Sequence, residues 1–298
     1  MIFGTSTGSK KINIESTCKK LFGKSKASEL LKKTGPKKLL ACNKNENTLT
    51  LSSKAWKNLR NKNLKNIQTL YYVTETPVKK FPGNGYLFAS ENNINENIQI
   101  VDINSGCTGF VDALTMSLSS QKKSIIICSE AYSKNIKIFS RSVSTLFSDG
   151  ASAFITDLSK LKLLDSSHGF LKNTYDDLAC NINSDISMDG KKVYDFVSTR
   201  VLPSLIKILK KNYDKKIHRI YIHQGSKFVV KFLKEKLKSY CKHIPSNISD
   251  KGNFVSATIP ILISQDLKKK PIKFNENILL CGFGVGLAYS HAIIQVNK

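Results

Sequence analysis

Apolar residues in this chain fall into short continuous runs separated by stretches of mixed character. Runs of this length that are bounded by polar or glycine-containing turns are typical of strands buried in a sheet. The runs lie at residues 69–74, 98–103, 124–129, 152–157, 219–224 and 277–283. Between them, residues 107–120, 193–211 and 226–240 carry apolar side chains at helical spacing. Strands that alternate with helices predict a layered α/β fold.

The order of these elements occurs twice along the chain. In the first half, the strand at 98–103 leads through a tight turn into a helix that begins near Cys107. In the second half, a polar segment containing Asn253 leads into an apolar helix, and the strand at 219–224 ends next to His223. The repeat is one of pattern and not of residue identity.

A repeat of this kind predicts two fused halves, which we place at residues 1–158 and 159–298. Cys107 and Asn253 then occupy matching helix starts. Open α/β sheets bind ligands at the carboxyl ends of their strands, so we expect Cys107, His223 and Asn253 on one face.

Composition limits the class of protein. The 298 residues are enough for one large domain or two half-domains, and the 41% hydrophobic content is ordinary. We find no secretory signal and no run of about 18 uninterrupted apolar residues, so we expect no membrane span. Seven cysteines without a CxxC pair favour free thiols in a reducing cytoplasm and no zinc site. We therefore expect a cytoplasmic protein without a bound metal.

The formal net charge of +25 raises the alternative of a polyanion-binding protein. Lysine supplies almost all of the positive charge, since arginine occurs only at positions 60, 141, 200 and 219. Specific readers of nucleic acid rely on arginine for bidentate contacts. We therefore favour a lysine-coated surface without specific nucleic-acid binding. Such a surface also suits an acidic protein partner.

Cys107 is the strongest candidate for a nucleophile. It lies in the segment NSGCTGF, where Gly106 and Gly109 allow a sharp turn from strand to helix. The positive end of a helix lowers the pKa of a thiol and favours the thiolate, which can accept an acyl group. The competing interpretation is a small buried core residue, and the glycine-rich setting favours the nucleophile.

His223 and Asn253 are individually weak candidates. A histidine at the end of an apolar strand is usually a core residue, and an asparagine before a helix is usually an N-cap. The conjunction of Cys107, His223 and Asn253 in this order, on these elements, is more specific than any one of them.

Six segments in chain order give the sequence a resemblance to a known family. They are TETPVKKFP with VDINSGCTGFVDAL, then TLFSDGASAFI, ISMDGKKVY, IHQGS, GNFVSATIP and GFGVGLAYS. Together they resemble the β-ketoacyl-acyl-carrier-protein synthase III family over nearly the whole chain. The resemblance implies a thiolase fold, with five αβαβα layers in two pseudo-symmetric halves, and a homodimer.

The resemblance also implies a reaction. Cys107 would accept an acyl starter from an acyl-coenzyme A or acyl-carrier-protein thioester. His223 and Asn253 would stabilise the enolate formed when malonyl-acyl-carrier protein loses CO2, and the enolate would attack the acyl group on Cys107. The backbone N–H groups of Cys107 and Val285 would hold the oxyanion. Thioesters of coenzyme A or acyl carrier protein are substrates here, and no other cofactor is implied.

Three further residues are implied to bind substrate. Phe81 would reach across the dimer to bound the acyl pocket, while Lys33 and Arg141 would contact coenzyme A. Two positions depart from the family pattern, because Glu29 replaces a tryptophan that clamps adenine and Ser226 replaces an asparagine. A carboxylate at Glu29 cannot stack on adenine and would repel phosphates, which favours a starter bound to acyl carrier protein, whereas Ser226 removes no catalytic atom.

Other functions remain open at this point. A relative that has lost condensation would transfer the acyl group to an alcohol or amine. A polyanion-binding protein is the alternative from another class. Tyr132 and Glu130, which follow the strand at 124–129, are assigned no role.

Overall fold

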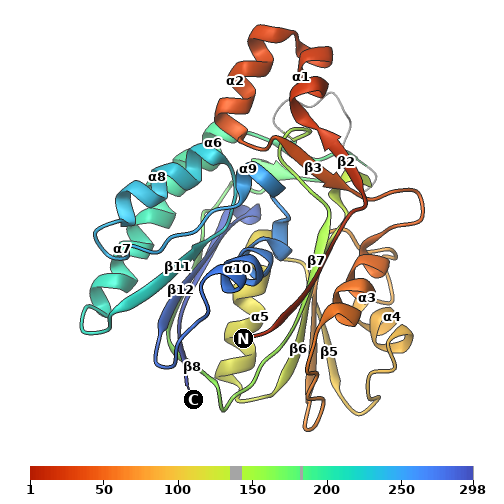
Figure 1. Cartoon of the computed structure of the whole chain (residues 1–298), viewed down its shortest axis with the longest axis vertical. Helices are drawn as coiled ribbons and strands as arrows, with labels where there is room; N and C mark the ends of the chain where they lie inside the picture. The colour runs from red at the N-terminus through yellow and green to blue at the C-terminus, as the bar shows by residue number, and fades with distance from the viewer. Residues whose placement is uncertain (135–142, 182–183, 298) are drawn as a thin grey trace.

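The computed structural model describes residues 1–134, 143–181 and 184–297, and it is built on two stacked β-sheets (Figure 1). The first sheet has the strand order β1-β7-β6-β4-β5. Its strands are β1 (Phe3–Thr7), β4 (Thr69–Val73), β5 (Gln99–Ile103), β6 (Ser124–Glu130) and β7 (Gly150–Ile155). β4 pairs in parallel with both β5 and β6, so the carboxyl ends of these three strands lie along one edge.

The second sheet has the strand order β11-β12-β13-β8. Its strands are β8 (Leu161–Phe170), β11 (Ile217–Ile222), β12 (Asn277–Gly284) and β13 (Ala288–Val296). β11 and β12 are parallel, whereas β13 is antiparallel to both of its neighbours. The carboxyl ends of β11 and β12 therefore also share an edge.

Helices fill the space between the sheets and cover their outer faces. α5 (Gly109–Ser119) and α10 (Thr258–Lys269) contact strands of both sheets and form the central layer (Figure 1). α3 (Thr48–Asn58) and α4 (Asn84–Glu91) cover the outer face of the first sheet. α7 (Leu202–Lys211) and α8 (Lys227–Leu237) cover that of the second. The predicted five-layer αβαβα arrangement is confirmed.

Alternation along the strands explains this layering. Leu70 and Tyr72 of β4 pack with the outer helices, whereas Tyr71 and Val73 face the central layer. In β11, Tyr221 faces the central layer. Because successive side chains of a strand point to opposite faces, a strand that is apolar throughout must be covered on both sides.

The remaining elements surround this core. They are β2 (Lys10–Asn13), α1 (Ile14–Phe22), α2 (Lys24–Thr34), β3 (Lys38–Ala41), β9 (Leu178–Ala179), β10 (Ser187–Met188), α6 (Gly190–Phe196) and α9 (Ile248–Lys251). The hairpin of α1 and α2 projects from the top of the molecule in Figure 1. No helix within the described residues is long and apolar enough to cross a membrane.

Buried charges tie β11 to the central layer. The Arg219 side chain, which is only 1% exposed, donates hydrogen bonds to Glu276 at 2.6 Å and to Asp266 at 3.1 Å. Asp266 also accepts hydrogen bonds from Tyr221 at 2.7 Å and is paired with His243 at 2.8 Å. Burial alone would raise the pKa of Asp266, but the hydrogen bonds from His243 and Tyr221 and the charge of Arg219 lower it overall.

We predict that Arg219→Met destabilises the protein by about 3–5 kcal/mol, because it leaves two buried carboxylates without their partner. Urea unfolding at neutral pH measures the effect. Lys238→Met, which removes an exposed ion pair with Glu235, is the matched control and should change stability little.

The lowered pKa of Asp266 also makes the stability of the folded protein depend on pH. A carboxyl group whose folded pKa is lowered stabilises the protein above its unfolded pKa of about 3.9. That stability is lost as the pH falls through the lower folded value.

An Arg219→Met protein as stable as the wild type at neutral pH would contradict the structural role of this network.

Candidate active site

Cys107 lies at the carboxyl edge of the first sheet, between β5 and α5. It is the central residue of a 3-10 turn (Gly106–Thr108) and is only 5% exposed. Gly106 has a φ of +46°, and a β-carbon there would lie 2.6 Å from both carboxylate oxygens of Glu75. Glycine is therefore required before the nucleophile for both backbone conformation and space. The predicted helix at 107–120 begins in this turn and becomes α-helical at Gly109.

The second half of the chain approaches Cys107 through the end of β12. A β-carbon on Gly284 would lie 2.7 Å from the Cys107 sulfur, and one on Gly282 would lie 2.8 Å from the Cys107 carbonyl oxygen. The backbone N–H groups of Val285 and of Cys107 itself are directed at the sulfur, where both favour negative charge. Two N–H groups from different halves of the chain therefore converge at the nucleophile.

His223 follows β11 directly and is buried among apolar groups. Its side chain is 1% exposed, and its ring stands edge-on to Phe283 with the centroids 5.4 Å apart. Burial lowers the pKa of His223 to about 3, so the imidazole is neutral at physiological pH. Its Nδ1 is buried without a hydrogen-bond partner. In a neutral ring one nitrogen carries a proton, so His223 can donate one hydrogen bond.

Asn253 is held in one orientation by its own helix start. Its Oδ1 accepts hydrogen bonds from the Val255 N–H at 2.8 Å and the Thr258 hydroxyl at 3.0 Å. Its backbone N–H donates to the Leu146 carbonyl at 2.9 Å. With the oxygen occupied in this way, the side-chain NH2 is left to donate to a ligand. Asn253 therefore acts as a cap and presents a donor at the same time.

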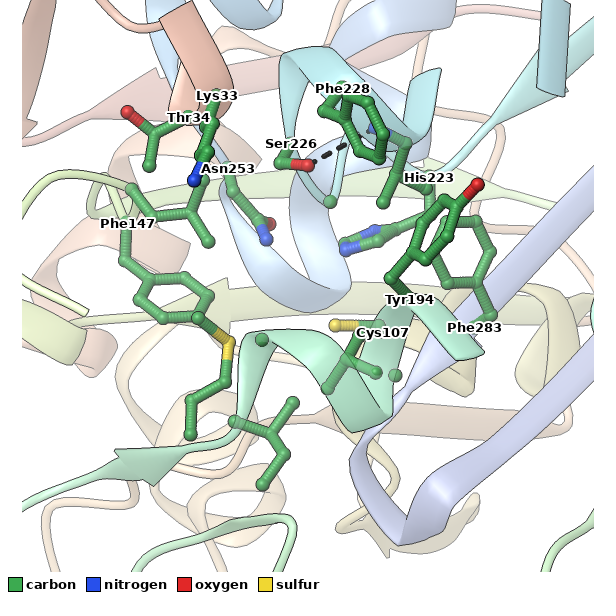
Figure 2. A pocket seen from close by; sticks show the side chains of 18 of the residues that line it. Lys33, Thr34, Cys107, Phe147, Tyr194, His223, Ser226, Phe228, Asn253 and Phe283 are labelled. Atoms are coloured by element: carbon green, nitrogen blue, oxygen red, sulfur yellow. Dashed lines mark hydrogen bonds between the residues drawn. The ribbon is translucent and has the colours of Figure 1, made fainter. Parts of the chain in front are cut away.

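The three predicted residues meet in one cavity of about 440 Å³. Figure 2 shows the imidazole of His223 and the carboxamide of Asn253 above the Cys107 sulfur, which points toward the gap between them. Apolar side chains supply most of the remaining wall, and they include Leu146, Phe147, Leu178, Met188 and Phe283. A buried thiol and two hydrogen-bond donors thus face an apolar chamber.

The mouth of the cavity contains Lys33, Thr34, Ser226 and Phe228 (Figure 2). Lys33 forms an exposed ion pair with Glu29 at 2.7 Å, so the carboxylate that departs from the family pattern partly neutralises it. Ser226 accepts a hydrogen bond from the Val229 N–H at 3.3 Å and thereby caps α8. Its hydroxyl oxygen is therefore used in the cap at the start of α8.

The roles of the other two implied substrate-binding residues stay predictions. Phe81 is 84% exposed and is not part of the cavity wall. Arg141 lies outside the described residues. Among the residues that the structure describes, no group of three or more His, Cys, Asp or Glu side chains is placed to hold a metal ion.

The expected electrostatics of Cys107 are wrong in direction. Burial raises the pKa of the Cys107 thiol well above its usual value, and the charges of Glu75 and Glu130 raise it further. These effects outweigh the N–H groups of Val285 and Cys107, so the resting group is a thiol. Glu75 was not predicted as part of the site. Its position directly after the apolar run at residues 69–74 was the available signal.

Comparison with known proteins agrees with this geometry. Residues 101–169 match the family model described as 3-oxoacyl-[acyl-carrier-protein] synthase III, and residues 211–296 match the model of its C-terminal part. The β-ketoacyl-[acyl-carrier-protein] synthase III of Streptococcus agalactiae is 28% identical over 85% of this chain and 86% of its own length. That of Clostridium novyi is 31% identical over 66% of this chain and 67% of its own.

Solved structures share the fold. The β-ketoacyl-[acyl-carrier-protein] synthase III of Thermus thermophilus superposes with a TM-score of 0.88 at 20% identity, covering 99% of this chain and 98% of its own. The enzyme of Aquifex aeolicus gives a TM-score of 0.87 at 22% identity, over 99% of this chain and 98% of its own. The two stacked sheets are therefore a thiolase fold, and this chain belongs to the β-ketoacyl-[acyl-carrier-protein] synthase III family of condensing enzymes.

Proposed function

We propose that this chain condenses an acyl starter with malonyl-acyl-carrier protein through an acyl thioester on Cys107. The observation that carries the proposal is the meeting of Cys107, His223 and Asn253 in one cavity, with two backbone N–H groups directed at the sulfur. The product would be a β-ketoacyl-acyl-carrier protein that starts a fatty acid or a related acyl chain.

In the first half-reaction, the Cys107 sulfur attacks the carbonyl carbon of the starter thioester. The carbonyl oxygen becomes an oxyanion, and the N–H groups of Cys107 and Val285 are placed to bind it. When the tetrahedral intermediate collapses, the bond to the carrier's sulfur breaks. The acyl group is then held on Cys107, and the carrier leaves through the mouth.

In the second half-reaction, the malonyl thioester carbonyl lies between His223 and Asn253. Loss of CO2 leaves an electron pair on the α-carbon and negative charge on the carbonyl oxygen. The side-chain NH2 of Asn253 and the N–H of neutral His223 stabilise this charge by hydrogen bonds. Fixed donors of this kind each contribute about 3–4 kcal/mol to lowering a barrier. The enolate carbon then attacks the acyl-Cys107 carbonyl, and the sulfur leaves.

The surface around the mouth supports an acidic carrier protein as partner. Lys33 and Lys191 line the cavity and are exposed, and Lys227 and Lys231 of α8 lie exposed beside it. Electrostatic attraction of this type speeds the encounter with an anionic partner and weakens with salt. The Glu29–Lys33 pair favours a starter delivered on acyl carrier protein over one delivered on coenzyme A.

A homodimer is also part of the proposal. β5 is an edge strand of the first sheet, and its residues are partly or fully exposed. Phe81 lies in the segment before α4 and is 84% exposed, which suits a side chain that enters a partner subunit. In that assembly Phe81 would bound the acyl pocket of the second subunit.

A non-condensing acyltransferase is the nearest alternative. It would need Cys107 but not a donor for an enolate, and the fixed orientation of Asn253 favours condensation. A polyanion-binding protein predicts binding to DNA that persists selectively at physiological salt. A polyanion-binding protein accounts neither for the two N–H groups at the sulfur nor for the two donors above it, and a non-condensing acyltransferase needs no pair of donors for an enolate.

We predict that wild-type protein incubated with acyl-coenzyme A and acyl-carrier-protein donors gains the mass of the acyl group on Cys107. Intact-protein mass spectrometry with peptide mapping measures this gain. Malonyl-acyl-carrier protein should then remove the label as a β-ketoacyl product, and Cys107→Ala should gain no mass. If an alcohol or amine removes the acyl group from Cys107 and malonyl-acyl-carrier protein does not, the protein is a non-condensing acyltransferase.

We predict that Asn253→Ala keeps acylation of Cys107 but slows condensation by about 100-fold or more, because one enolate donor is lost. His223→Ala should behave in the same way. Rapid quenching after a malonyl chase separates the two half-reactions. Asn95→Ala removes the same carboxamide from an exposed position outside the cavity wall, and it serves as the matched control. Condensation at the wild-type rate by Asn253→Ala would remove Asn253 from the mechanism.

A further inference from the structure

Three parallel strands place three ionisable groups along one edge of the first sheet. Glu75 lies two residues after β4, Cys107 lies four residues after β5, and Glu130 is the last residue of β6. Because the carboxyl ends of parallel strands meet at one edge, side chains that are far apart in sequence become neighbours. The nucleophile is therefore accompanied by two carboxyl groups that the mechanism above does not use.

The Glu75 carboxylate lies against the backbone that carries Cys107. Both of its oxygens are within 2.6 Å of the position that a β-carbon on Gly106 would take. The Tyr132 hydroxyl donates a hydrogen bond to one of these oxygens. The Tyr132 ring in turn packs on Phe147, with the centroids 5.0 Å apart, and Phe147 lines the cavity. Glu75 is thus anchored between the nucleophile's turn and the cavity wall.

Glu130 has a different, fixed place in the same cluster. It is completely buried and accepts hydrogen bonds from the Glu75 N–H at 3.1 Å and the Thr76 hydroxyl at 3.2 Å. Its other oxygen accepts a hydrogen bond of 2.6 Å from Ser256, in the turn that follows Asn253. One oxygen therefore ties Glu130 to the segment after β4, and the other ties it to the second half of the chain. The oxygen of Glu75 that Tyr132 does not contact is the carboxylate atom left to exchange a proton.

The charges in this cluster oppose one another. Burial and the charge of Glu75 raise the pKa of Glu130, and burial raises the pKa of Glu75. Burial, followed by the charges of the same two carboxylates, raises the pKa of Cys107 and that of Tyr132. A thiolate formed here would add one more negative charge unless a neighbouring carboxylate were neutralised at the same time.

His223 is a poor alternative acceptor for this proton. Burial lowers its pKa to about 3, so protonating the ring would place a charge in an apolar pocket. A carboxyl group whose pKa is raised is the better match for a thiol. Proton transfer from Cys107 to Glu75 also leaves the net charge of the buried cluster unchanged.

We propose that Glu75 accepts the Cys107 thiol proton during acylation and returns it to the sulfur after condensation. In the first step the S–H bond breaks, its electron pair forms the new bond from sulfur to the acyl carbon, and the proton joins the Glu75 carboxylate. The carrier's sulfur leaves with the electron pair of the old thioester and takes a proton from water. In the last step Glu75 protonates the departing Cys107 sulfur. The inference rests on the proposed acylation of Cys107.

The test is the pH dependence of Cys107 acylation by S-acetyl-N-acetylcysteamine, measured by quenched mass spectrometry. The wild-type rate should rise with pH through the titration of Glu75 and then level off. Glu75→Gln keeps an oxygen for the Tyr132 hydroxyl but cannot accept a proton. We expect it to acylate about 100-fold more slowly at neutral pH and to lose this rise. Glu91→Gln, which changes an exposed carboxylate on α4, should match the wild type.

The Tyr132→Phe variant provides a second measurement, the pH at which the acylation rate rises. A purely structural role for Glu75 predicts no change in this pH. Loss of the hydroxyl removes a hydrogen bond that favours ionised Glu75, so the rise in rate should shift to higher pH.

If Glu75→Gln acylates at or above the wild-type rate, the inference is overturned. Faster acylation would show that the carboxylate only opposes the thiolate. If wild-type Cys107 is not acylated by any donor, the proposed function fails as well.

Discussion

The end of β12 passes directly beside Cys107, and this close approach of two backbones controls the geometry of the site. β-carbons at Gly282 and Gly284 would lie 2.8 Å and 2.7 Å from atoms of Cys107, so only glycine permits the contact. The same approach aims the Val285 N–H at the sulfur. Because β12 also pairs with β11, whose end carries His223, the contact fixes the second sheet's donor relative to the nucleophile of the first. A larger side chain at either glycine would separate all of these groups together.

Parallel pairing explains why the functional groups gather where they do. β4, β5 and β6 end along one edge and deliver Glu75, Cys107 and Glu130. β11 and β12 end along another and deliver His223 and Val285. Hydrogen bonds across the interface then join the edges, because Glu130 accepts from Ser256 and Ser148 donates its N–H to the Asn253 carbonyl at 2.7 Å. The site is therefore a property of two sheet edges and not of any single loop.

Local pattern predicted a layered α/β fold and the candidate nucleophile Cys107, whereas the five layers and the roles of His223 and Asn253 came from the resemblance to the family. Continuous apolar runs identify strands that are covered on both faces, and the Gly-Cys-x-Gly turn is visible without coordinates. The pKa of Cys107 was predicted in the wrong direction, since a helix start is local whereas Glu75 and Glu130 act from other strands. The hairpin of α1 and α2 was not predicted, although its residues Ile14, Cys18 and Ala27 form a small buried cluster with Leu39. The role proposed for Phe81 requires a second subunit, so it depends on the proposed homodimer and not on local pattern.

The surface of this molecule is positively charged, whereas the ionisable groups buried around Cys107 include carboxyl groups. The chain carries a net charge of +25, and the lysines that line the cavity, Lys33 and Lys191, are exposed. Around the nucleophile the ionisable neighbours are carboxyl groups and a neutral histidine. Negative charge that develops on a thioester oxygen must therefore be stabilised by N–H dipoles, which are already oriented and add no net charge. The exposed lysines, where we propose that an anionic carrier docks, and the carboxyl groups, to which we assign proton transfer, thus lie in separate regions of the same protein.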